Sequence, residues 1–194
     1  MTGYSYDVVG NKVSNTYPDG SVVKYGHDAL NRLTSVTDAE NEITTYNYDP
    51  VGRPIEILYP NGIMEQKKYD PVGQLVEILR NGQQQSVYTY DPAGNLMSDS
   101  STSESTMAVI IENIYNALNQ LTVKTVKNEL EQITGQFEYT YDKRGNLVKE
   151  SDVLNSTEKT YLYDATNKMG CITNSGVDNK SNCCSHSAEI SVSL

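Results

Sequence analysis

A Tyr-Asp dipeptide, or a close variant of it, recurs along this chain at nearly constant spacing. The copies are Tyr6-Asp7, His27-Asp28, Tyr48-Asp49, Tyr69-Asp70, Tyr90-Asp91, Tyr115-Asn116, Tyr141-Asp142 and Tyr163-Asp164. They follow one another at intervals of 21, 21, 21, 21, 25, 26 and 22 residues. Self-similarity at a fixed period of this length is the signature of a repeat architecture. The 194-residue chain is therefore predicted to be an array of equivalent units.

Each copy is predicted to open a tight turn. Four residues after each aromatic position stands Gly or Asn, the two residue types that best tolerate a left-handed backbone. In Asp49-Pro50-Val51-Gly52, Asp occupies the first turn position, Pro the second and Gly the fourth. Asp accepts hydrogen bonds from the backbone two residues on, and Pro presets φ, so the motif predicts a type I turn. The turn formers expected on this basis are Asp49, Gly52, Asp70, Gly73, Asp91, Gly94, Asp142 and Gly145.

A second turn lies about halfway through several repeats. It is indicated by Pro18-Asp19-Gly20, Pro60-Asn61-Gly62 and Asn81-Gly82, since Asp-Gly and Asn-Gly between short apolar stretches are strong hairpin signals. The segments between turns are about six residues long and often alternate in polarity, which is typical of strands. We therefore expect an all-β fold of tandem antiparallel β-hairpin repeats that form one long twisted sheet. Two strands per repeat advance the sheet by roughly 10 Å.

Some tracts depart from the pattern. The Ser/Thr-rich stretch 98–106 is expected to bulge out as a solvated loop, and a longer hairpin turn is expected around 127–131. From residue 170 onward the repeat stops. The expected organisation is a repeat array over 1–169 and a divergent, poorly ordered tail over 170–194. An array without polar end caps exposes edge strands, so edge-to-edge self-association is also expected.

Charge and hydropathy narrow the function classes. The formal net charge of −10 argues against a nucleic-acid partner, which requires clustered Lys and Arg. The longest apolar run, Met107 to Ile111, is far shorter than a membrane span. The N-terminal residues lack the charged and apolar regions of a signal peptide. From the residues alone, the chain is either cytosolic or an excised piece.

The repeated carboxylates and tyrosines have structural and chemical interpretations. The Asp series could supply a glycosidase-like pair, but identical repeats give identical environments, whereas an acid and a base need different ones. Each Asp is therefore expected to cap its own turn. The tyrosines, represented by Tyr48, Tyr69, Tyr90 and Tyr141, are expected to line the sheet, with glycan contact by exposed rings as an alternative.

The cysteines form the cluster that most resembles a metal site. Cys171, Cys183, Cys184 and His186 carry ligand-type side chains, but adjacent Cys183-Cys184 lacks the paired spacing of zinc sites. Reactive thiols in a disordered tail, one structural disulfide and a metal site remain the alternatives. His27 is interpreted as a replacement for Tyr at a repeat position. No catalytic, cofactor-binding or metal-binding residue is predicted, and no enzyme activity is expected.

The repeat resembles the YD-repeat, or Rhs-repeat, family. The pattern Tyr-Asp-x-x-Gly-Arg/Asn-Leu is clearest in Tyr48 to Arg53, Tyr90 to Leu96 and Tyr141 to Leu147, and the resemblance covers residues 4 to 169. It implies a sheet that spirals into a hollow shell, of which this chain would form an open arc. It also implies a secreted or cell-surface location, with the remaining shell or a C-terminal toxin domain as partner. Surface glycans stay the alternative partner, on the basis of exposed tyrosines. Nothing after Met169 resembles the self-cleaving segment of some members, so no protease residue is predicted.

Overall fold

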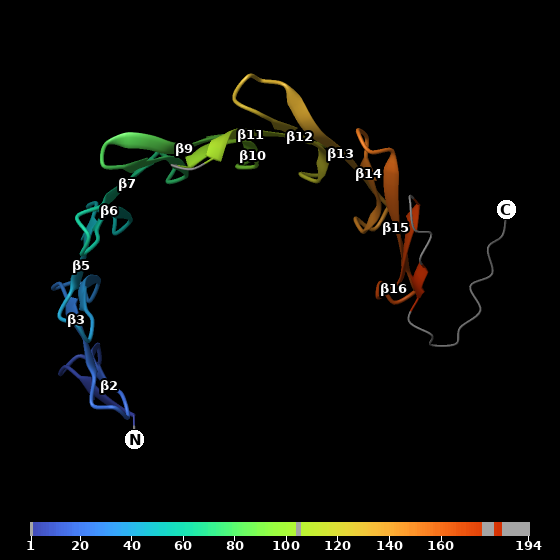
Figure 1. Cartoon of the computed structure of the whole chain (residues 1–194). Helices are drawn as coiled ribbons and strands as arrows, with labels where there is room; N and C mark the ends of the chain where they lie inside the picture. The colour runs from blue at the N-terminus through green and yellow to red at the C-terminus, as the bar shows by residue number, and fades with distance from the viewer. Residues whose placement is uncertain (1, 104–105, 176–180, 184–194) are drawn as a thin grey trace. The chain divides into compact units, whose positions relative to one another are not determined.

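The chain is built from β-strands throughout the part that this computed structural model describes, residues 2–103, 106–175 and 181–183 (Figure 1). Two compact units are present, Met1–Tyr88 and Thr89–Leu194, and strand β9 crosses the boundary between them. The strands are β1 (Gly3–Tyr6), β2 (Lys12–Thr16), β3 (Val22–His27), β4 (Leu33–Thr37), β5 (Ile43–Tyr48), β6 (Pro54–Leu58), β7 (Met64–Tyr69), β8 (Leu75–Arg80), β9 (Gln83–Tyr90), β10 (Leu96–Ser103), β11 (Thr106–Tyr115), β12 (Leu121–Lys127), β13 (Ile133–Tyr141), β14 (Leu147–Asp152), β15 (Thr157–Tyr163), β16 (Met169–Ser175) and β17 (Ser181–Cys183).

Within each unit, every strand pairs antiparallel with the strand that follows it in the chain. The pairs run from β1 to β9 in the first unit and from β10 to β17 in the second. The strands of each unit thus form a continuous antiparallel sheet. This topology confirms the predicted all-β fold of tandem antiparallel hairpins.

The predicted turns form at the predicted residues. The amide of Gly52 donates to the carbonyl oxygen of Asp49 at 3.0 Å, as a type I turn requires. At the opposite end of the hairpins, Asn81 and Gly82 form a two-residue connection between β8 and β9 with φ values of 50° and 77°. Two consecutive positive φ values are the geometry of a type I′ turn, which matches the twist of the flanking strands.

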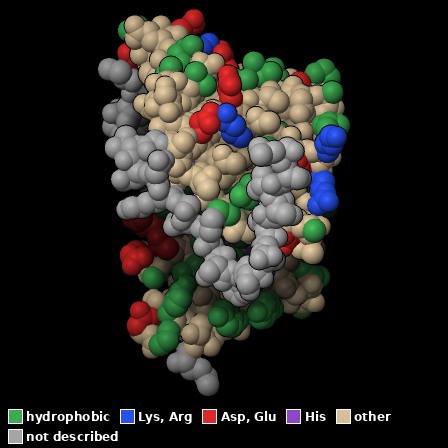
Figure 2. Space-filling model, turned by 90° about the vertical axis from the view of Figure 1, so that its right-hand side faces the viewer, with side chains coloured by type: hydrophobic (Ala, Val, Ile, Leu, Met, Phe, Trp, Pro, Cys, Tyr) green, Lys and Arg blue, Asp and Glu red, His purple; other side chains and the backbone are tan. Residues whose placement is uncertain are grey.

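The sheet is a single layer. Figure 1 shows no second layer of secondary structure over the described strands of either unit. Among the described residues, Cys171 is the only buried hydrophobic side chain, and Asn15 and Asn113 are the buried polar ones. Hydrophobic side chains consequently reach the molecular surface among acidic and basic ones (Figure 2). Most globular domains bury one sheet face against another layer, so this sheet must be stabilised by contacts within itself.

Cross-strand polar pairs supply part of that stabilisation. Asn47 donates to Glu56 at 2.9 Å, and Gln66 donates to the other carboxylate oxygen of Glu56 at 3.2 Å. Lys68 pairs with Glu77 at 2.6 Å, across β7 and β8. Paired residues point to the same face of an antiparallel sheet, so these groups form rows of cross-strand contacts.

A β-bulge lies next to the Tyr-Asp position in seven hairpins. In the β5–β6 pair, Asn47 faces Glu56 but Tyr48 faces Pro54, so Ile55 is the extra residue. The same shift occurs at Tyr6, His27, Tyr69, Tyr115, Tyr141 and Tyr163. A bulge bends its strand and increases the local twist. The strand periodicity that predicted the hairpins did not reveal these extra residues.

One predicted loop is instead strand, and one predicted long turn is short. Most of the Ser/Thr-rich stretch extends β10, where Asp99 faces Ile111 and Ser100 faces Ile110 across the pair with β11. Pairing with the apolar, β-branched strand β11 draws this polar stretch into the sheet, and only residues 104–105 lie outside the described part. Near residue 128 the turn is no longer than the others, because the amide of Glu131 donates to the carbonyl oxygen of Asn128. The additional residues lengthen β12 and β13.

The sheet also continues beyond the expected boundary at residue 169. Strand β16 pairs with β15 up to Ser175, and β17 pairs with β16. The expected poorly ordered tail is therefore wrong for residues 170–175 and 181–183, because backbone pairing with an existing strand edge does not require the Tyr-Asp motif. The rest of that tail, including Cys184 and His186, lies outside the described residues.

The same segment excludes one of the three interpretations of the cysteines. Cys171 is disulfide-bonded and buried, and Cys183 is the residue opposite it in the β16–β17 ladder. The interpretation of Cys171 as a reactive thiol in a disordered tail is wrong, because the strand places it in the sheet. No group of three metal-ligating side chains occurs in the described part of the chain.

Candidate functional site: the Tyr-Asp turn column

Each Tyr-Asp turn is a closed set of hydrogen bonds around one carboxylate, as the turn of Asp49 shows. The amide of Asp49 donates to the carbonyl oxygen of Arg53 at 2.9 Å. One carboxylate oxygen, Oδ1, accepts from the amides of Val51 at 3.0 Å and Arg53 at 2.9 Å. Gly52 completes the turn with φ at 90°, a backbone conformation that side chains disfavour. The Asp therefore satisfies backbone donors that the turn would otherwise leave to water.

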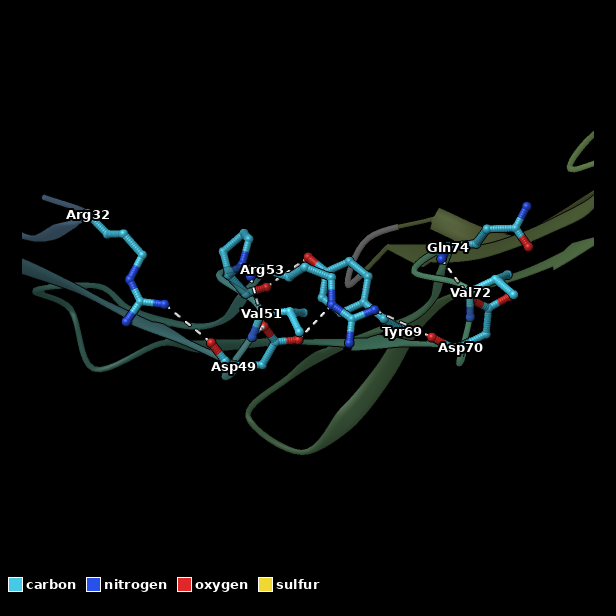
Figure 3. A network of polar contacts seen from close by, with 9 residues as sticks. Arg32, Asp49, Val51, Arg53, Tyr69, Asp70, Val72 and Gln74 are labelled. Carbon is cyan, nitrogen blue, oxygen red and sulfur yellow. Dashed lines mark hydrogen bonds and ion pairs between the residues drawn. The ribbon is translucent and has the colours of Figure 1, made fainter. Parts of the chain in front are cut away.

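The residue after the turn glycine connects one turn to the next. Arg53 donates from Nε to Oδ2 of Asp49 at 2.6 Å and from Nη1 to the carbonyl oxygen of Asp70 at 3.4 Å (Figure 3). Arg32 does the same between Asp28 and the carbonyl oxygen of Asp49, at 2.7 and 3.2 Å. The planar guanidinium presents several donors in fixed directions, so a single side chain can bind two successive turns.

Asn performs this linking role elsewhere in the chain. Asn146 donates from Nδ2 to Asp142 at 2.9 Å and to the side chain of Asn167 at 2.6 Å. Asn11 links the turns of Asp7 and Asn31 in the same way. We call the linked series the turn column. It comprises residues 7–11, 28–32, 49–53 and 70–74 in the first unit, and 91–95, 116–120, 142–146 and 164–168 in the second.

The tyrosines of the motif form a second link between repeats. Tyr48 donates its hydroxyl hydrogen to the carbonyl oxygen of Leu33 at 2.7 Å, and Tyr69 donates to that of Pro54 at 2.8 Å. Tyr115 and Tyr141 bond in the same way to Leu96 and Leu121, at 3.0 and 2.9 Å. Each of these acceptors stands five residues after the Asp or Asn of the preceding turn. Besides lining the sheet as predicted, each of these tyrosines therefore donates a hydrogen bond to a backbone carbonyl oxygen of the preceding repeat.

Arginine and tyrosine also stack along the column. The guanidinium carbon of Arg32 lies 4.7 Å from the ring centroid of Tyr48, and that of Arg53 lies 4.7 Å from the ring centroid of Tyr69. Both distances fit a cation–π contact. The Arg side chain, its own Asp, the next backbone carbonyl and the next Tyr ring therefore form one interlocked contact set.

Hydrogen bonding lowers the pKa of several carboxyl groups of the column. The side-chain amide of Asn146, together with backbone amides, lowers the pKa of Asp142 below its ordinary value. Asn95 has the same effect on the pKa of Asp91. For Asp28, the backbone amide of Arg32 is the main cause of the lowered pKa. Hydrogen bonds to the ionised form favour that form.

Two repeats replace residues of the motif. Asn116 stands where Asp is usual, and its side-chain oxygen accepts from the amides of Leu118 and Gln120 at 2.9 and 3.0 Å. The turn thus needs an acceptor rather than a charge. His27 occupies the Tyr position opposite Leu33, and its buried Nδ1 has no hydrogen-bond partner.

The column geometry supports the turn-capping interpretation of the Asp series. Its hydrogen bonds place each column Asp in its own local turn, with equivalent partners from repeat to repeat. An acid and a base need carboxylates with contrasting environments, and this arrangement does not provide that contrast.

Most tyrosine rings are unavailable as a flat binding platform. Of the 15 tyrosines, Tyr4, Tyr6 and Tyr17 are exposed, and the other 12 are half-buried. Stacking of a sugar requires an accessible ring face. The alternative of a tyrosine ladder for glycans is therefore reduced to three residues near the N-terminus.

The sequence reasoning missed the links between turns. Arg, Asn or Gln stands after the turn Gly or Asn in seven of the eight copies, at Asn11, Arg32, Arg53, Gln74, Asn95, Gln120 and Asn146. Lys168 occupies the eighth. Each of these residue types carries a side-chain donor long enough to reach a neighbouring turn. Their recurrence after the turn Gly or Asn was the sequence signal for these links.

The comparisons with known proteins agree with this geometry. Residues 6–43 and 27–64 match the RHS Repeat family, and residues 63–170 match the Teneurin YD-shell family. The second match spans more than half of the chain. The chain belongs to the Rhs/YD-repeat family. No curated protein sequence matches it closely enough to add a relative.

Solved structures place the YD repeats in a known fold. A structure of the Photorhabdus luminescens Tc holotoxin pore, with a mutated TccC3, matches 94% of this chain at a TM-score of 0.62 and 16% identity. A crystal structure of TcdB2-TccC3 matches 93% of the chain at a TM-score of 0.43 and 13% identity. The chain spans only 12% and 13% of those two chains. The first likeness shows a shared fold for the YD-repeat sheet.

Proposed function

We propose that this chain is a non-catalytic wall segment of an Rhs/YD shell that helps to enclose or present a toxin or surface domain. The turn column is the observation that carries the proposal. A sheet with almost no buried core needs another source of rigidity, and the column supplies it through links such as Arg53 to Asp70. A wall of single-layer thickness encloses the largest volume for a given length of chain.

The partners proposed for this wall are the remaining shell and a C-terminal toxin domain. The support is the family membership, together with the similar fold within a Tc holotoxin pore. We also propose a secreted or surface location. The disulfide at Cys171 supports it, because disulfides persist mainly in oxidising compartments. No helix in the described residues is long and apolar enough to cross a membrane.

Protease protection tests the enclosing role. The chain would be tagged in its native host, isolated with whatever remains attached, and digested with increasing protease. A second preparation would carry Arg32→Leu and Arg53→Leu, which remove two links of the column. We expect the attached domain to resist digestion in the unaltered complex and to become sensitive in the variant. Equal sensitivity of the attached domain in both preparations would refute an enclosing wall.

Binding to surface glycans stays a prediction without a supporting contact. If it occurs, it must use Tyr4, Tyr6 or Tyr17, the exposed rings among the described residues. Saturable binding to purified wall polysaccharide that is lost on changing these three residues to Ala would support it.

A further inference from the structure

Two positions of neighbouring turns are matched in residue type along the column. The link residue stands four positions after the turn Asp or Asn, and the tip residue is the Gly or Asn three positions after it. Wherever the link residue is Asn, the tip residue of the next turn is Asn, and wherever it is Arg or Gln, the next tip residue is Gly. The seven successive pairs are Asn11 with Asn31, Arg32 with Gly52, Arg53 with Gly73, Gln74 with Gly94, Asn95 with Asn119, Gln120 with Gly145, and Asn146 with Asn167.

An Asn link residue bonds to the side chain of the next tip residue. Its Nδ2 donates to Oδ1 of the tip Asn at 2.8, 3.0 and 2.6 Å in the pairs Asn11–Asn31, Asn95–Asn119 and Asn146–Asn167. A single methylene separates the Asn amide from the backbone, so this donor needs an acceptor that projects toward it. The tip Asn supplies that acceptor.

An Arg or Gln link residue bonds to a backbone carbonyl oxygen of the next turn instead. Nη1 of Arg32 and of Arg53 donates to the carbonyl oxygen of the next turn Asp, at 3.2 and 3.4 Å (Figure 3). Nε2 of Gln120 donates to the carbonyl oxygen of its tip residue at 3.5 Å. The link side chain lies in the space beside the tip. A Cβ would lie 3.9, 3.5 and 3.3 Å from the nearest link nitrogen at Gly52, Gly73 and Gly145, respectively.

A mismatched pair loses its link in either direction. An Asn link residue opposite a Gly tip finds no side-chain acceptor, and it is shorter than the Arg and Gln side chains that reach the backbone. An Arg or Gln link residue opposite an Asn tip meets a side chain in the space that it needs. In both cases the donor returns to water, and the hydrogen bond no longer contributes to stability.

We propose that the link and tip residues form a two-class recognition code by which each hairpin selects its neighbour in the column. Similar repeats are prone to pair with a wrong neighbour, and specificity requires that wrong pairs lose contacts. If each turn were set against the turn after next, four of the six resulting pairs would be mismatched. These four are Asn11 with Gly52, Gln74 with Asn119, Asn95 with Gly145, and Gln120 with Asn167. The code concerns contacts within this chain, so it holds or fails independently of the proposed wall function.

A double-mutant cycle in the full chain tests the code at Arg53 and Gly73. Arg53→Asn sets Asn against Gly, Gly73→Asn sets Arg against Asn, and the double variant restores a matched pair of the other class. Each single change should lower the midpoint of urea unfolding. We expect the unfolding equilibrium constant of the double variant to be at least about threefold smaller than the two single changes together predict. Hydrogen exchange of the Val72 and Gln74 amides, which donate to Asp70, should show the same coupling locally.

A control cycle combines Arg32→Asn with Gly73→Asn. Arg32 bonds to the turn of Gly52 rather than to that of Gly73, so these two changes should be additive. The conformational cost of Asn at position 73, where φ is 95°, enters both cycles equally. The link is therefore what distinguishes them.

The reverse cycle combines Asn11→Arg with Asn31→Gly and converts an Asn pair into an Arg–Gly pair. We expect coupling of the same sign as in the Arg53–Gly73 cycle. If Gly73→Asn prevents folding, this cycle decides alone, because Gly accepts the left-handed backbone of Asn31. Additive effects in the Arg53–Gly73 and Asn11–Asn31 cycles would overturn the code. Coupling of equal size in the control cycle would also overturn it, because that pair shares no link.

Discussion

Tyr69 donates its hydroxyl hydrogen to the carbonyl oxygen of Pro54, 15 positions earlier, at 2.8 Å. The bond joins the motif of one repeat to the strand that follows the previous turn, and it recurs from Tyr48 to Leu33. At these motifs a repeat is thus fastened to its predecessor by a side chain that the sequence alone presents merely as a lining ring.

Removing this hydroxyl should weaken the array while leaving the ring in place. Tyr69→Phe is expected to lower the free energy of unfolding by about 1 kcal/mol, because the carbonyl oxygen of Pro54 loses its side-chain donor. The exposed Tyr17 provides the control, and Tyr17→Phe should change stability little. Chemical denaturation of both variants measures the difference. Equal midpoints for the two variants would show that the hydroxyl bond contributes nothing.

Asn should replace Arg53 only in part, and an apolar residue should not replace it at all. Arg53→Leu removes the contacts to Asp49, to the carbonyl oxygen of Asp70 and to the ring of Tyr69, and it should cost roughly 1 kcal/mol. Arg53→Asn should cost less, because an Asn keeps the contact to its own turn Asp, as Asn146 does to Asp142. It should still lose the link to the next turn, since Asn11 and Asn146 donate to Asn side chains there and Gly73 has no side chain to accept. Hydrogen exchange of the Val51 and Gln74 amides would report the loss locally. Identical exchange in both variants would argue against a linking role.

Left-handed geometry at Gly73 should make this position intolerant of β-branched residues. Its φ is 95°, so Gly73→Val should destabilise the chain by about 1–3 kcal/mol. A Cβ there would meet only Arg53, at 3.5 Å, so the cost is conformational rather than steric crowding. Gly73→Asn should be milder, since Asn31 and Asn119 occupy the same turn position with φ near 60°. Thermal melts compare the two variants, and a Val variant as stable as the Asn variant would contradict the assignment.

The array should lose stability in acid. The Asn146 side chain and backbone amides lower the pKa of Asp142 in the folded state. A carboxyl group whose pKa is lowered by folding adds stability above its unfolded pKa, and that stability is lost as the pH falls through the folded value. The decline should therefore begin near about pH 4 and continue below it. Asp142→Asn, which copies the natural Asn116, should flatten this part of the profile in melts recorded against pH. An unchanged acid profile would show that Asp142 does not contribute.

Reduction of the disulfide at Cys171 should destabilise the end of the sheet that holds β16 and β17. Cys171 is disulfide-bonded, and the other cysteines of the chain are the adjacent Cys183 and Cys184, so we expect a bond from Cys171 to one of these two. Tryptic digestion without reductant should join the peptide 169–180 to the peptide 181–194, and fragmentation should identify which of the two adjacent cysteines is bonded. Cys171→Ser should lower the local stability of the β16–β17 hairpin by about 2–3 kcal/mol. Two unlinked peptides in the oxidised protein would contradict this bond.

The local geometry of the turns could be predicted from the residues that form them. Asp49, Pro50 and Gly52 act within four positions of one another, so the type I turn follows from their own preferences. Asn81-Gly82 likewise defines its hairpin. The Ser/Thr-rich stretch could not be predicted in this way, because its strand conformation depends on β11, which supplies Ile110 and Ile111 opposite it.

The repeat by itself determined the all-β class, the hairpin order and the positions of both kinds of turn, because these depend on short-range preferences copied from unit to unit. Only the tertiary structure decided how the units hold together. The bulge at Tyr69, the reach of Arg53 to Asp70 and the bond from Tyr69 to Pro54 depend on the relative position of neighbouring repeats. Register and distance between strands are properties of the folded sheet, and no single repeat contains them.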